Sequence, residues 1–170
     1  MPPRHVVELE ATRLGASFRK LIRRYASQKR SGRQLETDVP GTYGSIVATL
    51  RHLVGADSWY LFDLTRDPAR RIEEAGMGLD ELRDAIEADG PAWQAFLDAN
   101  TDPDVIVREV DEDDGFERDA TVGVRLAQAL HHGTDHRSQI CTALTSLGVE
   151  PPPIDVWDFG EVDGRVVNLG

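Results

Sequence analysis

The sequence predicts an all-α protein built as a four-helix bundle, with a non-helical tail at its C-terminus. Apolar residues recur at helical spacing in four stretches, residues 5–25, 43–65, 79–97 and 122–147. The links between these stretches are rich in proline, glycine and charged residues. The chain has 170 residues and no internal repeat, so we expect one core and a single domain over residues 1–170.

The first two predicted helices are joined by a polar link that ends in Pro40 and Gly41. In residues 5–25 the helical spacing runs from Val7 to Tyr25, with two prolines just upstream of its start. The apolar stripe of residues 43–65 covers about a third of the helix circumference. Thr42 or Ser45 can cap the start of this helix, and an Asp-Pro pair ends it.

The third predicted helix contains Gly90 and Pro91, a pair that should kink the helix or split it in two. The next stretch, residues 102–119, lacks the helical period. Its alternating Val105, Val107 and Glu109 fit either a short hairpin or an extended loop.

The last predicted helix ends at Gly148, and the three prolines that follow prevent its continuation. The tail beyond them, residues 154–170, has no helical pattern. We expect it to be non-helical, with Trp157 and Phe159 packed back onto the bundle.

Composition excludes several classes of protein. The formal net charge of −11 argues against a protein that follows the phosphate backbone of a nucleic acid. No stretch approaches the ~20 apolar residues of a membrane span, and no signal peptide is evident. Cys141 is the only cysteine, so a disulfide framework is excluded. We therefore expect a soluble, cytoplasmic protein with neither a nucleic-acid nor a membrane partner.

Three histidines are the candidate metal ligands. His132 and His136 are four residues apart, so one side of a helix carries both imidazoles. On a wheel of ~100° per residue they lie on one flank of the apolar arc, whereas His131 faces solvent. His52 lies on the equivalent flank of the second predicted helix. If the two flanks face each other, the three imidazoles converge as in a catalytic divalent-metal site. From spacing alone, half-buried histidines with ordinary hydrogen bonds explain the pattern equally well.

Asp57 and Arg137 each lie in the middle of an apolar stripe, where an unpaired charge is costly. We expect them to meet, or each to meet another buried partner. A buried ion pair that fixes helix register is the simpler interpretation. They are also the two candidate catalytic residues, Asp57 as a proton acceptor and Arg137 as a group that binds an anion. Gln128 and Gln139 share the side of His132 and His136 and could line the pocket.

Two segments resemble the DinB/YfiT-like superfamily, a family of metal-binding four-helix bundles. They are PGTYGSIVATLRHLVGADSWYL, from residue 40, and LAQALHHGTDHRSQICTALTSLGVEPPPIDVWDF, which ends at residue 159. The resemblance implies a bundle, often a homodimer, that holds a divalent ion, zinc or nickel, through His52, His132 and His136. It also implies a metalloenzyme that uses a low-molecular-weight thiol as an S-transferase or isomerase. Two alternatives stay open: a protein that binds metal or a small molecule without turnover, such as a stress-response sensor, and a metal-dependent hydrolase.

Overall fold

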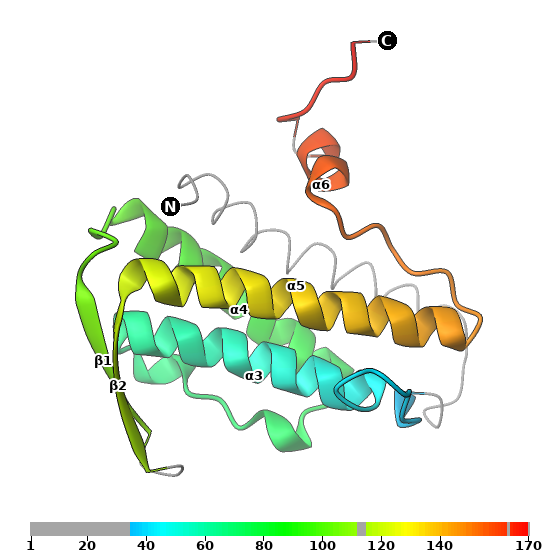
Figure 1. Cartoon of the computed structure of the whole chain (residues 1–170), viewed down its shortest axis with the longest axis horizontal. Coiled ribbons are helices and arrows are strands. Elements are labelled where there is room, and N and C mark those ends of the chain that lie inside the picture. The colour runs from blue at the N-terminus through cyan, green and yellow to red at the C-terminus, as the bar shows by residue number, and fades with distance from the viewer. Residues whose placement is uncertain (1–34, 112–114, 163, 170) are drawn as a thin grey trace.

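The computed structural model describes residues 35–111, 115–162 and 164–169. The main body of this part consists of three long helices, α3 (Ile46–Thr65), α4 (Leu79–Asp98) and α5 (Val122–Ser146). Helices α3 and α5 lie side by side and run in opposite directions, and α4 packs against α3 (Figure 1). Two short 3₁₀ helices, η1 (Pro68–Arg70) and η2 (Glu74–Gly76), lie in the link between α3 and α4.

The predicted ends of the long helices agree with the structure. The Ser45 side chain accepts a hydrogen bond from Ala48 N at the start of α3, as an N-cap does. Gly148 follows α5 with φ of 70°, a left-handed conformation that glycine adopts without steric cost. Helix α4 continues through Pro91, so the Gly-Pro pair does not split it. The predicted helix at residues 5–25 lies outside the described residues.

The expected all-α fold class is wrong, because the described part combines its helices with a small antiparallel hairpin. Strands β1 (Ile106–Asp111) and β2 (Phe116–Thr121) pair with Glu109 opposite Arg118, and the hairpin crosses one end of α3 and α5 (Figure 1). The most buried residue of β1 is Glu109, at 4% exposure, so the inward face of this strand carries a carboxylate. The alternation of apolar and polar residues that identifies a strand is therefore weak here.

The C-terminal tail also differs from the expectation. It contains a short helix, α6 (Val156–Val162), and Trp157 is 72% exposed rather than packed on the bundle. Three consecutive prolines before α6 favour an extended backbone, and the segment leads away from the three long helices (Figure 1). The side chain of Phe159 lies outside the described part.

The core of the described part consists of two apolar clusters with polar residues between them. One cluster includes Leu50, Leu53, Ile86, Ile140 and Leu144. The other, nearer the hairpin, includes Leu61, Trp93, Leu97, Val122 and Leu126. The middle of α5, with His132 and His136, lies between these clusters, and His52 of α3 lies between Leu50 and Leu53 of the first cluster. No described helix has the length and apolar character needed to cross a membrane.

Candidate metal centre

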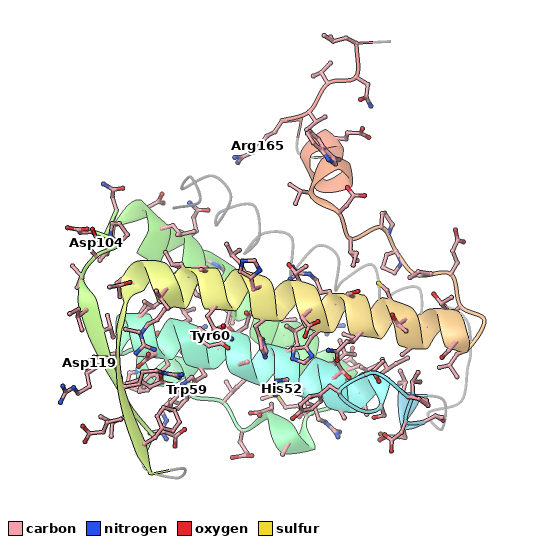
Figure 2. The ribbon with its side chains drawn as sticks, viewed as in Figure 1. His52, Trp59, Tyr60, Asp104, Asp119 and Arg165 are labelled. Carbon is pink, nitrogen blue, oxygen red and sulfur yellow. The ribbon has the colours of Figure 1, made fainter. Side chains whose placement is uncertain are left out.

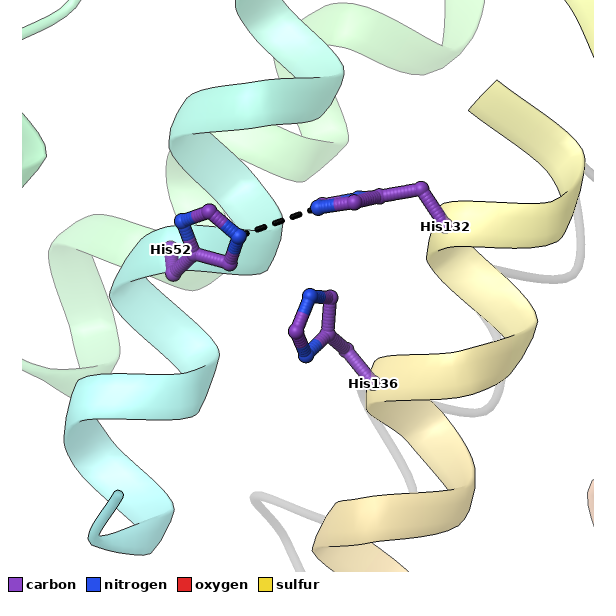
Figure 3. A group of neighbouring side chains, drawn as sticks. All are labelled: His52, His132 and His136. Atoms are coloured by element: carbon purple, nitrogen blue, oxygen red, sulfur yellow. Dashed lines mark hydrogen bonds between the residues drawn. The ribbon is translucent and has the colours of Figure 1, made fainter. Parts of the chain in front are cut away.

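The structure brings His52, His132 and His136 together. Figure 3 shows their rings turned toward one another, His52 from α3 and the other two from α5. One ring nitrogen of each lies within 4.8 Å of the others, and Nε2 of His132 is 3.0 Å from Nε2 of His52. The convergence predicted from the helical wheels is therefore confirmed.

Helix geometry explains why these three histidines meet and a fourth does not. His132 and His136 are one turn apart on α5, and α3 packs along the same flank, so His52 faces both. His131 is on the opposite side of α5 and is exposed. The three converging side chains are half-buried or buried, and His136 is only 6% exposed.

The environment favours the neutral form of two of these imidazoles. Burial lowers the pKa of His132 to about 4, and the neighbouring His136 and His52 add to this effect. Burial also lowers the pKa of His52, His136 contributes, and the negative charge of Glu74 opposes the shift. Neutral imidazoles have the free lone pair that a metal ion requires, so both rings are suited to ligation at neutral pH.

Tyr43, which precedes α3, and Gln139 of α5 hold the rings of His52 and His136 in place. Tyr43 stacks on His52, with ring centroids 4.2 Å apart and planes at 10°. Its backbone N–H donates to Gln139 Oε1 at 2.8 Å. The same Gln139 oxygen lies 3.3 Å from His136 Nδ1, and because an amide oxygen only accepts, Nδ1 carries the proton there. Nε2 of His136 then keeps its lone pair on the side of the other two histidines.

The spacing of the rings fits a divalent ion. Zinc binds histidine nitrogen at ~2.0–2.1 Å, so two nitrogens on one tetrahedral ion lie roughly 3.3 Å apart. The 3.0 Å between the Nε2 atoms of His52 and His132 is close to that value. Gln139 fixes the proton of His136 in the way that residues around metal sites orient their ligands. The donor set, three histidines and no thiolate, is one that zinc, nickel and other borderline ions accept.

A pocket of about 500 Å³ opens beside His52. Helix α3 contributes its inner wall, with Trp59 and Tyr60 lying between His52 and the hairpin (Figure 2). Residues 70–74 and inward-facing side chains of the hairpin form the rest of the lining. Gln128 donates to the Tyr60 hydroxyl at 3.3 Å, and burial raises the pKa of that hydroxyl.

Glu109 joins the hairpin side of the pocket to the helices. One carboxylate oxygen accepts from Trp59 Nε1 at 3.0 Å, and the other accepts from Arg118 Nη2 at 2.6 Å and Arg125 Nη1 at 3.1 Å. Burial would raise the pKa of Glu109, but these hydrogen bonds hold it below its usual value. Arg125 also forms an ion pair with Asp63 of α3, so one buried network joins both helices to the hairpin.

Asp57 and Arg137 are both buried, at 6% and 7% exposure, as their wheel positions predict. Arg137 Nη2 donates to Thr134 Oγ1 at 3.0 Å, and each of the two charged residues has a further interaction. Their direct pairing stays a prediction, and neither residue is among those that line the pocket beside His52.

Sequence reasoning missed the contributions of Glu74, Tyr43 and the Glu109 network. Glu74 lies in a link that shows only a charged, glycine-containing composition. One signal was available, because Gly55 interrupts a strong helical pattern and an isolated glycine there indicates close packing. The Glu109 network joins residues far apart in the sequence, and no local pattern indicates that.

A helical domain with three convergent histidines beside an open pocket belongs to the class of helical proteins equipped to bind a divalent metal ion. The chain belongs to the DinB family, whose family model matches residues 31–165 and so includes all three histidines. The comparison with curated proteins finds no match.

Proposed function

We propose that this protein is a divalent-metal-dependent enzyme that uses a small thiol, as an S-transferase or isomerase. The observation that carries the proposal is the convergence of three imidazoles, one of which, His52, lines an open pocket. His52, His132 and His136 are the proposed ligands, and zinc or nickel is the proposed metal. A divalent ion held by these residues would lower the pKa of a bound thiol and so would make a thiolate nucleophile available at neutral pH.

The residues of the chain orient the histidine rings, bind the small molecule in the pocket and partly exclude water from it. Gln139 and Tyr43 keep His136 and His52 in their orientations. Trp59 and Tyr60 offer aromatic surface to the carbon skeleton of a small molecule in the pocket. The buried Glu109 network holds the hairpin over the outer side of that pocket, which keeps its dimensions fixed.

The experiment is a turnover assay with a panel of small thiols and a chromogenic electrophile. Metal-loaded protein should give saturable turnover that is lost on metal removal and in His136→Ala. His131→Ala is the matched control, because this neighbouring histidine is exposed and outside the cluster. Thiol binding without turnover would favour a binding or sensor protein, and metal-dependent ester cleavage without thiol would favour a hydrolase. Either result would contradict the proposed transferase or isomerase.

A further inference from the structure

Gly55 leaves a space on α3 one turn beyond His52, and Glu74 fills it. Glycine is a poor residue for the interior of a helix, so its presence needs a packing reason. A Cβ atom at position 55 would lie 2.4 Å from Cδ of Glu74 and 2.7 Å from its Oε1. An alanine there would collide with the carboxyl group itself. The missing side chain therefore allows the Glu74 carboxylate to lie against the helix that carries His52.

Glu74 has no hydrogen bond or ion pair from its side chain to any residue in the described ranges 35–111, 115–162 and 164–169. Its side chain is half-buried and lines the pocket together with His52. Residues three apart on a helix are neighbours on one face, so the carboxylate beside Gly55 is also near His52. Its negative charge acts on that imidazole, which agrees with this proximity. A half-buried carboxylate in a pocket, with its acceptor oxygens unused, is available to a bound molecule.

The cations of the pocket do not neutralise Glu74. Arg70 pairs with Asp89 at 2.6 Å and with Asp67, and Arg118 pairs with Glu109 at 2.6 Å. Arg71 lies over the rings of Trp59 and Phe62, with its guanidinium carbon 5.8 and 5.5 Å from their centroids. Next to His52 the pocket therefore keeps a carboxylate that pairs with no cation among the residues that the structure describes.

We propose that Glu74 is a specificity residue that accepts a hydrogen bond from an ammonium group of the molecule bound beside His52, so that the pocket selects aminothiols. The inference rests on the proposed function, because the thiol end of such a molecule would occupy the metal side of the pocket. An ammonium gives the strongest complement to a partly desolvated carboxylate, stronger than a hydroxyl. A carboxylate at the same place would be repelled.

The test compares three thiols of similar length that differ in their far group: cysteamine with an ammonium, 2-mercaptoethanol with a hydroxyl and 3-mercaptopropionate with a carboxylate. Each is titrated into cobalt-loaded protein, and binding is followed by the thiolate-to-cobalt charge-transfer absorption, which needs no turnover. The measured quantity is the ratio of the dissociation constants of cysteamine and 2-mercaptoethanol. Comparing this ratio between variants removes the intrinsic difference in acidity of the two thiols.

In the wild type cysteamine should bind most tightly and 3-mercaptopropionate least. Glu74→Gln should reduce the preference for cysteamine over 2-mercaptoethanol by about tenfold, with metal content unchanged. Gly55→Ala should reproduce this loss by displacing the carboxylate, and it should not unfold α3 because alanine favours the helix. Glu73→Gln is the matched control, since Glu73 is the exposed neighbour that lines the same pocket, and its ratio should equal that of the wild type.

An unchanged ratio in Glu74→Gln, or tighter binding of 3-mercaptopropionate than of cysteamine by the wild type, would overturn the inference and leave the proposed function standing. Absence of the charge-transfer band with all three thiols would refute the thiol function, and with it the selection of aminothiols. The two failures are therefore distinguishable.

Discussion

Arg125 is the cation at the centre of the buried network that joins the hairpin to the helices. It is 5% exposed and contacts two carboxylates, Asp63 at 1% and Glu109 at 4% exposure. Replacement of Arg125 by methionine keeps much of the side-chain volume and removes the charge. Two carboxylates would then share a water-excluded site without that partner.

Removal of one partner from a buried ion pair costs about 3–5 kcal/mol. Arg125→Met should therefore lower the free energy of unfolding at pH 7 by that amount, measured by urea denaturation with far-ultraviolet circular dichroism. The loss should shrink in acid. Burial raises the pKa of Asp63 and Arg125 opposes this rise. Without Arg125 the folded protein binds a proton on Asp63 more readily than the unfolded chain does, so stability increases as the pH falls toward the pKa of the folded state.

Arg108→Gln is the control, because Arg108 pairs with Asp119 at 2.7 Å on the exposed face of the same hairpin. Exposed pairs contribute little, so this variant should remain close to the wild type. Addition of Asp63→Asn and Glu109→Gln to Arg125→Met should restore part of the loss by removing the two buried negative charges that Arg125 contacts in the wild type. The reasoning would be refuted if Arg125→Met cost no more than Arg108→Gln.

Three further predictions concern other parts of the molecule. The pKa of His132 is about 4 in the folded protein and near 6.5 in the unfolded chain. The unfolded chain therefore binds more protons than the folded protein between these pH values, and metal-free protein should lose stability as the pH falls through that range. Urea titrations should find this loss reduced in His132→Asn. Trp59→Phe removes the hydrogen bond to Glu109 and should cost about 1 kcal/mol in the same assay, whereas an unchanged midpoint would show that the contact is not stabilising. Leu50→Ala removes a core side chain that is 1% exposed and should cost about 2–5 kcal/mol, while Leu169→Ala, at 94% exposure, should change nothing measurable.

The sequence predicted the convergence of the three histidines better than it predicted the fold class. His52 and the pair on α5 could be chosen because helical periodicity is a local property, and the flank of an apolar stripe points toward the neighbouring helix. The exposed position of His131 followed from the same wheel. The end of α5 at Gly148 was equally local, since it depends on one glycine and the prolines beyond it.

Features that depend on contacts between distant residues could not be predicted in this way. Residues 102–119 fitted either a hairpin or an extended loop, and the structure has the hairpin. The sequence could not decide between them, because Glu109 stabilises the hairpin through residues of α3 and α5 and puts a charge at its buried position. Trp157 was expected to pack on the bundle because it is large and apolar, but the prolines before it direct the chain outward.

The central claim is that His52, His132 and His136 form one metal site. Elemental analysis of protein purified without a metal-affinity tag, after growth with ample zinc and nickel, tests it most directly. We predict about one divalent ion per chain in the wild type and in His131→Ala, and little in His52→Ala or His136→Ala, because three imidazoles and one open position define a site of this kind. Metal far below one ion per chain in the wild type, or unchanged metal in both cluster variants, would contradict the claim.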